Sequence, residues 1–231
     1  VLLDDGKIHL KIVEKAENVT ENGGENTQEK RYFAKVLWGG LLKSRKSVAL
    51  PGAKIYPPTL TNSDLANIKI AKEMGVTGVM QPFVRDHSDL ECVKEALREA
   101  GAEDIRLFAK IENMDGVRKL EELLPAADEI VIARGDLGNS VHLWDLPGVQ
   151  RQISEKCRAA GKPFMVVTQM LASMERSPVP TRAEVNDIFH AVMDGAASIM
   201  VTGETAVGDY PVEVIRYMVN TVRSAEKEEN R

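Results

Sequence analysis

Two short polar runs carry the residues best suited to chemistry. KIENMDG spans Lys110 to Gly116, and ARGDLG spans Ala133 to Gly138. Each run follows a short apolar stretch rich in β-forming residues, RLFA before the first and EIVI before the second. Each run therefore indicates a strand that ends in polar residues and passes into a helix, which is how parallel-sheet enzymes build their active sites.

The lysine and the acids of these runs suggest a site for a cation and an anion. Lys110 and Glu112 are two residues apart, so on a strand their side chains point to the same side. Asp136 is predicted to join Glu112 in binding one divalent cation, while Lys110 faces the anion bound to that cation. The alternative is that both acids are solvated at helix starts and that Lys110 forms only a structural ion pair with one of them.

The composition is that of an ordinary globular protein. The chain has 231 residues, of which 43% are hydrophobic and 28% charged, and its net charge is −5. Lys and Arg are scattered, so no face for nucleic acid is expected. No apolar stretch approaches the roughly 20 residues of a membrane span. Cys92 and Cys157 lack metal-ligand spacing, and we expect a cytoplasmic protein. The chain begins at Val1 without Met, so a leader or more could precede it.

Strand and helix patterns alternate from about residue 53 onward, giving five βα units. Predicted strands cover 75–84, 105–111, 129–133, 163–168 and 197–202. Predicted helices cover 63–74, 88–100, 115–124, 147–160, 181–194 and 211–227. Thr181 and Glu184 make a capping box that should start one of these helices. Such alternation predicts an α/β fold with a parallel sheet and helices outside it.

The first 52 residues follow a different pattern. Short alternating stretches at 7–13 and 31–38 flank the glycine-containing run 21–28, which predicts a small antiparallel β module with a Gly-rich hairpin. We therefore divide the chain into domains 1–52 and 53–231. A closed barrel takes eight βα units and roughly 250 residues, so five units form either an open sheet or the latter part of a barrel.

Five motifs resemble those of the pyruvate kinase family, in that family's order: KIENMDG, ARGDLG, AGKPFMVVTQML, PTRAE and GETAVGDYP. The resemblance covers essentially the whole chain. It implies a (β/α)8 TIM-type barrel with a small β lid inserted after the third strand and a regulatory domain after the last helix. By this mapping, 1–52 is part of the lid, 53–231 carries barrel strands four to eight, and the chain stops before the regulatory domain.

The resemblance also implies an activity and its site residues. Pyruvate kinases transfer the phosphoryl group of phosphoenolpyruvate to ADP, giving pyruvate and ATP in the last step of glycolysis, with Mg²⁺ and usually K⁺. Glu112 and Asp136 match the Mg²⁺ ligands, and Lys110 matches the lysine beside the transferring phosphoryl group and the enolate oxygen. The backbone of Gly135 and Asp136 matches the cradle for the substrate carboxylate. Thr168 matches the threonine near the methylene carbon, which serves the proton transfer that forms pyruvate.

The nucleotide side is expected to depart from the family pattern. Lys46 matches a lysine that meets the nucleotide phosphates, although an exposed loop lysine is the alternative. Thr202 and Glu204 are expected near the nucleotide, where Val207 replaces a common lysine.

The turn after Asp136 departs from the family pattern too. Arg134 is expected to make structural contacts there, and Asn139 and Ser140 replace an apolar residue and an acid.

Some expected parts of the site have no counterpart in this sequence. In the family the first barrel strands supply an arginine that meets phosphate and the ligands for K⁺, and none of these positions lies in this chain. If the 231 residues were the whole molecule, we would expect weak binding of Mg²⁺ and of pyruvate or oxalate, with little kinase turnover. A full-length protein is expected to be a homo-oligomer.

Two other functions remain open from the sequence. A metal-dependent aldolase or lyase of pyruvate or oxaloacetate also uses Glu and Asp about one βα unit apart, but it needs no nucleotide lid. The third hypothesis is a noncatalytic binding module derived from the kinase.

Overall fold

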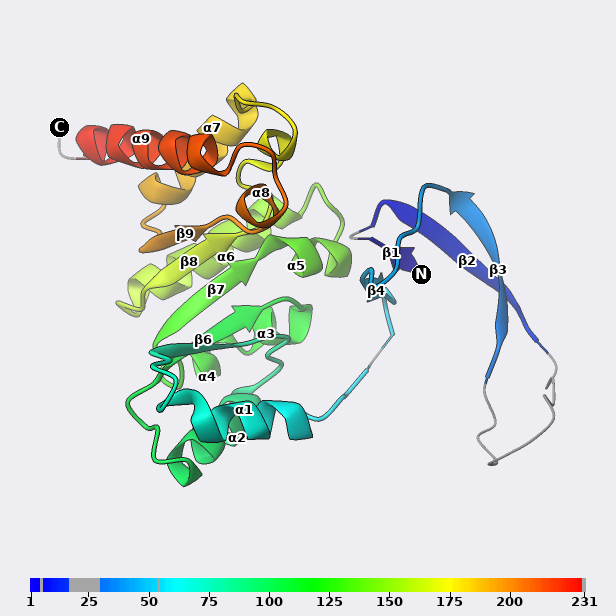
Figure 1. Ribbon diagram of the computed structural model, residues 1–231, viewed down its shortest axis with the longest axis horizontal. Coiled ribbons are helices and arrows are strands. Elements are labelled where there is room, and N and C mark those ends of the chain that lie inside the picture. The colour runs from blue at the N-terminus through cyan, green and yellow to red at the C-terminus, as the bar shows by residue number, and fades with distance from the viewer. Residues whose placement is uncertain (5, 17–29, 54, 230–231) are drawn as a thin grey trace. The chain divides into compact units, whose positions relative to one another are not determined.

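The structure is a computed structural model that describes residues 1–4, 6–16, 30–53 and 55–229 (Figure 1). The chain forms two compact units, Val1–Ile55 and Tyr56–Arg231. None of the helices among these residues is long and apolar enough to cross a membrane.

The first unit contains a four-stranded antiparallel sheet in the order β3-β2-β1-β4. Its strands are β1 (Leu2–Leu3), β2 (Ile8–Lys15), β3 (Tyr32–Trp38) and β4 (Val48–Ala49). The prediction of a small antiparallel sheet from 7–13 and 31–38 is thus confirmed. The predicted Gly-rich hairpin at 21–28 lies outside the described residues.

The second unit is built on a five-stranded parallel sheet whose strands follow one another in chain order. They are β5 (Gly78–Gln81), β6 (Arg106–Ile111), β7 (Glu129–Ala133), β8 (Phe164–Val167) and β9 (Ser198–Met200). The predicted parallel α/β fold is confirmed. The first strand ends at Gln81, earlier than the predicted residue 84, because the backbone turns at Phe83, whose φ is 52°.

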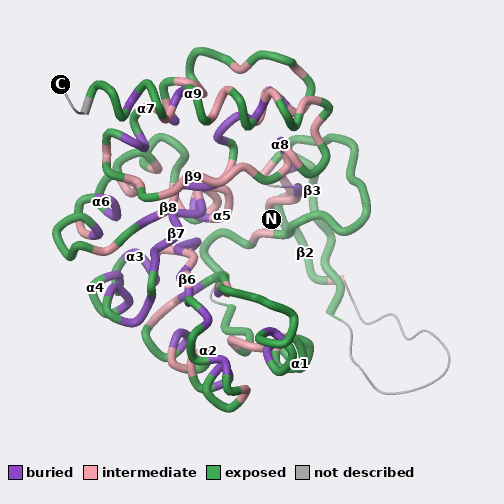
Figure 2. The backbone as a smooth tube through the Cα atoms, turned by 60° about the vertical axis from the view of Figure 1, so that its left-hand side comes forward, coloured by how far each residue is buried: buried purple, intermediate pink, exposed green. Residues whose placement is uncertain are grey.

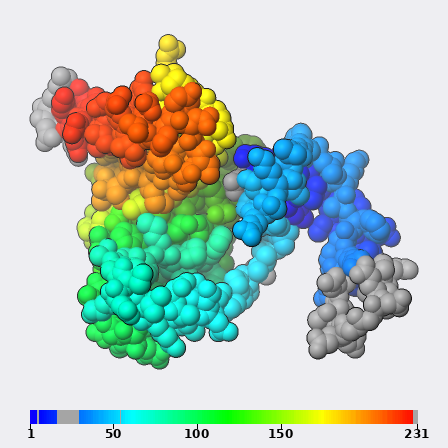
Figure 3. All heavy atoms as spheres, in the orientation of Figure 1, coloured from blue at the N-terminus to red at the C-terminus, as the bar shows by residue number. Residues whose placement is uncertain are grey.

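Helices connect the strands, as parallel crossovers require. They are α1 (Asn62–Ala71), α2 (His87–Glu99), α3 (Met114–Arg118), α4 (Leu120–Leu123), α5 (Arg134–Ser140), α6 (Leu146–Ala159), α7 (Arg182–Met193), α8 (Gly203–Ala206) and α9 (Pro211–Glu229), with a short 3-10 helix at Ala172–Glu175. The helix predicted at 115–124 is two short helices, because Lys119 departs from helical geometry between them. The space-filling view shows α1 in cyan and α9 in orange to red at opposite ends of this unit (Figure 3).

The start of α7 confirms the predicted capping box. The Thr181 hydroxyl accepts a hydrogen bond from the Glu184 N–H at 3.3 Å, and the Glu184 carboxylate accepts one from the Thr181 N–H at 2.8 Å. The same carboxylate accepts hydrogen bonds from the N–H and hydroxyl of Ser173. Burial alone raises the pKa of Glu184, but these hydrogen bonds outweigh it and lower the pKa. This carboxylate therefore ties the start of α7 to the 3-10 helix before it.

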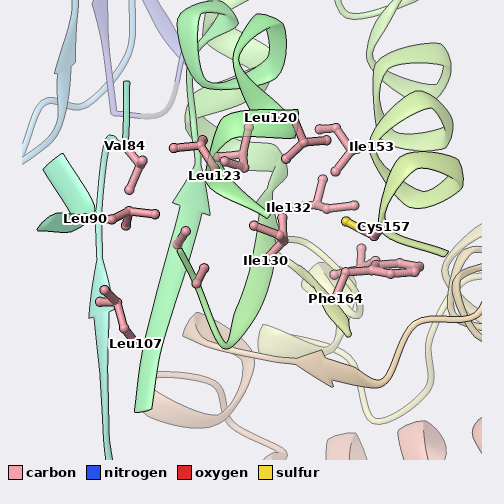
Figure 4. Packing of buried hydrophobic residues seen from close by; sticks show 14 of the residues in the cluster. Val84, Leu90, Leu107, Leu120, Leu123, Ile130, Ile132, Ile153, Cys157 and Phe164 are labelled. Atoms are coloured by element: carbon pink, nitrogen blue, oxygen red, sulfur yellow. The ribbon is translucent and has the colours of Figure 1, made fainter. Parts of the chain in front are cut away.

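The main core lies between one face of the parallel sheet and the helices (Figure 2). Every residue of β7 is buried, as expected for the central strand of a covered sheet. Leu120 of α4, Ile132 of β7 and Ile153 of α6 are completely buried and point into this core (Figure 4). Cys157 of α6 lies in the same layer, where burial raises the pKa of its thiol to about 12.

The other face of the sheet carries a smaller apolar cluster. Val131, Ala133 and Val167 form it, with Phe108 packed against them. Side chains alternate along a strand, so Lys110 projects to the same face as Phe108. Leu107, Ala109 and Ile111 of β6 thus face the helix-side core, whereas Phe108 and Lys110 face the other side of the sheet.

Candidate active site

The strands β6, β7 and β8 end at one edge of the sheet. Ile111 pairs with Ile132, and Ala133 pairs with Val167. Because the three strands are parallel, the polar residues that follow them leave the sheet at the same edge. The two polar runs and the end of the third strand are therefore neighbours in the fold.

Lys110 and Glu112 form an ion pair at the end of β6. The Lys110 ammonium lies 2.8 Å from Glu112 Oε1, and the Glu112 side chain is only 2% exposed. The other oxygen, Oε2, accepts a hydrogen bond from the Phe83 N–H at 2.7 Å. Both carboxylate oxygens are thus held, one by a charge and one by the backbone that follows β5. The predicted same-side arrangement of the two side chains is present, and it includes the structural ion pair given as the alternative.

Asp136 lies in the first turn of α5, on the connection that follows β7. The Ser140 hydroxyl lies 3.3 Å from the carbonyl oxygen of Glu112 and 3.4 Å from that of Asp136. One hydroxyl group therefore lies within hydrogen-bond reach of both main-chain segments. The structure brings together the two segments that carry the predicted metal ligands.

Thr168 follows β8 with an unusual backbone conformation. Its φ is 80°, and the φ of Gln169 is 55°. For a β-branched residue a left-handed conformation costs on the order of 1–3 kcal/mol, and it persists only where the surroundings enforce it. Gly135 leaves room for the Thr168 side chain in this conformation, since a Cβ on this glycine would lie 2.9 Å from Thr168 Cγ2. Thr168 therefore packs directly on the turn that carries Asp136.

Adding a methyl group at this glycine should disturb the contact. We expect Gly135→Ala to lower the free energy of unfolding by about 1–3 kcal/mol, because the new Cβ overpacks against Thr168. Gly148→Ala is the matched control, since Gly148 also lies near the start of a helix and a Cβ there meets nothing within 4 Å. That control should be stabilising by up to about 1 kcal/mol. Urea unfolding measures both, and equal effects of the two variants would contradict the predicted clash.

Glu204 is a buried acid that organises the adjacent loops. Its side chain accepts hydrogen bonds from the N–H of Thr202 at 2.8 Å and of Leu171 at 3.2 Å. The residue is 2% exposed, whereas Val207 nearby in the sequence is 65% exposed. The structure thus uses Glu204 to join the loops after β8 and β9, and the expected proximity of Thr202 and Glu204 to a nucleotide stays a prediction.

Lys46 lies in the first unit, between β3 and β4. Its ammonium is 2.8 Å from Asp4 Oδ1, and its side chain is 36% exposed. The hydrogen bond from Lys46 lowers the pKa of the Asp4 carboxyl, against the opposing effect of burial. The contact of Lys46 with nucleotide phosphates stays a prediction.

Three residues that contact this edge were missed from the sequence. Phe83 supplies an N–H to Glu112, Ser140 lies between two main-chain segments, and Asp187 binds Arg134. Ser140 carried a signal, because it departs from the family pattern. Phe83 and Asp187 carried none, because their roles depend on residues far away in the sequence.

Comparison with known proteins identifies the family. A family model described as the barrel domain of pyruvate kinase matches residues 1–215. The chain belongs to the pyruvate kinase family. Pyruvate kinase of Bacillus licheniformis is 39% identical over 227 residues, which are 98% of this chain and 37% of that protein. Pyruvate kinase of Dictyostelium discoideum is 40% identical over 228 residues, which are 98% of this chain and 42% of that protein. The chain therefore spans well under half the length of these relatives.

Pyruvate kinases generally depend on Mg²⁺ and K⁺. Among the described residues, no group of three or more His, Cys, Asp or Glu side chains could hold a metal ion. Mg²⁺ is commonly bound by one or two carboxylates, with waters and substrate oxygens completing its coordination. Glu112 and Asp136 on adjoining segments fit this pattern of ligation.

Proposed function

We propose that this chain contributes to the transfer of a phosphoryl group from phosphoenolpyruvate to ADP, giving pyruvate and ATP. The observation that carries the proposal is the Lys110–Glu112 pair at the end of β6, beside the turn of Asp136, within a chain of the pyruvate kinase family. Phosphoryl transfer requires positioning and positive charge more than covalent participation by the protein. This edge offers both.

Glu112 and Asp136 are proposed to hold Mg²⁺, which when bound offsets negative charge on the substrate oxygens. Lys110 pairs with the nearly inaccessible Glu112 carboxylate. Its ammonium is the proposed positive charge that would face the phosphoryl group and the enolate oxygen of a bound substrate. A point charge held in a sheltered site stabilises developing charge strongly.

The turn of α5 and the end of β8 are proposed to bind the carboxylate and the reacting carbon of the substrate. The N–H groups of Gly135 and Asp136 are the proposed donors to the substrate carboxylate. Thr168 packs on Gly135, and its hydroxyl is the proposed source, through water, of the proton added to the methylene carbon. The contact between Thr168 and Gly135 supports placing these two functions side by side.

Other parts of the proposal rest on the family alone. Lys46 is proposed to meet the nucleotide phosphates, K⁺ is the proposed monovalent cation, and its ligands are proposed to lie outside this chain. We further propose a cytoplasmic protein that is a homo-oligomer at full length. Of the two other hypotheses, the aldolase or lyase loses support, because the family match extends through residues 1–52.

Metal binding tests the proposal directly. We expect Glu112→Gln to weaken Mn²⁺ binding at least about 10-fold, because it removes a charged oxygen ligand. Mn²⁺ replaces Mg²⁺ here because its binding is measured by electron paramagnetic resonance. Glu129→Gln is the matched control: Glu129 is also a buried acid of this sheet, at the opposite end of the strands, where it accepts a hydrogen bond from Ser198.

The control should leave Mn²⁺ affinity unchanged. Equal affinities of the natural chain and Glu112→Gln would overturn the metal assignment. For the reaction, the natural protein that carries these residues should form ATP from phosphoenolpyruvate and ADP in a coupled assay. A protein that binds Mn²⁺ but forms no ATP would support the noncatalytic hypothesis instead.

A further inference from the structure

Arg134 connects three elements through one guanidinium group. Its Nη1 lies 2.8 Å and 2.7 Å from the two carboxylate oxygens of Asp187 on α7. Its Nη2 donates a hydrogen bond to the carbonyl oxygen of Thr168 at 2.7 Å and lies 2.8 Å from the sulfur of Met170. The Arg134 side chain is only 13% exposed, so these contacts take the place of water.

The segment that Arg134 binds is the one with the unfavourable backbone. Thr168 and Gln169 both have positive φ, and neither is a glycine. The Thr168 carbonyl belongs to the peptide that joins these two residues, and Arg134 holds that carbonyl directly. A hydrogen bond from a charged donor is about twice as strong as one between neutral groups. The guanidinium therefore acts at the point where the strain is located.

The same turn holds Thr168 from a second direction. Gly135, the next residue after Arg134, leaves the space that Thr168 Cγ2 occupies. The side chain of Arg134 thus holds the carbonyl group of Thr168, and the missing Cβ of Gly135 makes room for the Thr168 side chain. Both contacts link Thr168 to the turn that carries Asp136.

Asp187 is what keeps the guanidinium in this orientation. A poorly exposed arginine without a carboxylate partner would carry an uncompensated charge and would turn toward water. Asp187 supplies both of its oxygens, and it lies within α7, a regular helix with a capping box at its start. The anchor for Thr168 is therefore a helix outside the site itself.

We propose that Arg134, oriented by Asp187, is a positioning residue that keeps Thr168 in its left-handed conformation, with its hydroxyl directed at the substrate. The catalytic consequence rests on the proposed function, because it concerns the proton added to the enol. The structural consequence does not. Loss of either charge should release Thr168 while leaving the metal ligands Glu112 and Asp136 in place.

The first experiment follows Thr168 itself in the 231-residue chain. Methyl-labelled threonine gives an NMR signal for Thr168, which is assigned by its loss in Thr168→Ser. We expect Asp187→Asn and Arg134→Gln to shift this signal. Arg176→Gln should not shift it, although it also breaks an arginine–aspartate pair of 2.8 Å, because Arg176 is 70% exposed and binds Asp209.

The second experiment separates positioning from a general structural role. In the natural protein, pyruvate with Mn²⁺ should exchange its methyl hydrogens for solvent deuterium. Asp187→Asn should slow this exchange about 10-fold or more, because a small misplacement of a reacting group is costly, and should leave Mn²⁺ affinity unchanged. Arg134→Lys keeps the positive charge, but an ammonium group lacks the planar guanidinium that binds both the Asp187 carboxylate and the Thr168 carbonyl. This variant should therefore give an intermediate exchange rate.

Each outcome decides a different question. An unshifted Thr168 signal in both Asp187→Asn and Arg134→Gln would overturn the proposal. So would a fall in Mn²⁺ affinity that matches the fall in exchange rate, because Arg134 would then support the whole edge. A shifted signal in a protein that shows no exchange even in its natural form would leave the positioning role standing and would count against the proposed function.

Discussion

Replacing Lys110 with alanine is expected to lower the rate of ATP formation by about 10²–10³-fold in the natural protein that carries this chain. The reason is that its ammonium lies at the edge where Glu112 and the turn of Asp136 meet, 2.8 Å from the carboxylate that it neutralises. Charge that develops on the transferred group would lose the ammonium that is proposed to face it. A coupled assay with phosphoenolpyruvate and ADP measures the loss.

The control for this variant is Lys72→Ala. Lys72 likewise pairs with a carboxylate, 2.9 Å from Asp104, but its side chain is 58% exposed. It should change the rate little. A Lys110→Ala protein with the activity of the natural protein would contradict the assigned role. If the protein forms no ATP and Lys110→Ala leaves its biological effect unchanged, the noncatalytic hypothesis is favoured.

Replacing Asp89 with alanine is expected to lower the free energy of unfolding by about 3–5 kcal/mol, the typical cost of removing one partner of a buried ion pair. The Asp89 side chain is 5% exposed. It accepts hydrogen bonds from Arg85 Nη2 at 2.6 Å, Arg85 Nε at 3.0 Å and the Thr59 hydroxyl at 2.5 Å. Alanine would leave the guanidinium of Arg85 without its charge partner. Urea unfolding measures the change.

Asp104→Ala is the comparison, because Asp104 is paired with Lys72 but is 69% exposed. Exposed pairs contribute at most about 1 kcal/mol, so its effect should be small. Similar effects of the two variants would show that the Asp89 network contributes no more than an exposed pair.

The Asp89 carboxylate should also make the free energy of unfolding depend on pH. Burial by itself raises the pKa of Asp89, but hydrogen bonds from Arg85 and Thr59 outweigh it and lower the pKa to about 2, from an ordinary 3.8. A lowered pKa in the folded state stabilises the protein above pH 4, and this contribution is lost as the pH falls toward 2. It amounts to about 2 kcal/mol. The difference in stability between the natural chain and Asp89→Ala should therefore shrink between pH 5 and pH 2.

Much of the candidate active site, at the edge where β6, β7 and β8 end, is predictable from sequence because it depends on short-range rules. The two-residue spacing of Lys110 and Glu112 puts both on one side of a strand, and parallel strands bring successive ends to one edge. Thr181 and Glu184 mark a helix start through contacts three residues apart. These features need no knowledge of distant partners.

The rest of the edge depends on residues far apart in the sequence. Phe83 turns left-handed and donates to Glu112, 29 residues away, and Thr168 is held by Arg134, 34 residues away. Neither Phe nor Thr favours positive φ, so local preference predicts the wrong conformation at both positions. This is also why the first strand of the parallel sheet is shorter than its apolar pattern suggests.

The burial of Cys157 makes its thiol a reporter of local opening between α6 and the sheet. With a pKa of about 12, almost none of its sulfur is thiolate at neutral pH, and the closed packing of α6 on β7 keeps alkylating reagents away. Cys92 is exposed and reacts without such a barrier. The slow phase of alkylation would then be that of Cys157. Its rate would report how often α6 separates from the sheet by local opening of the native protein.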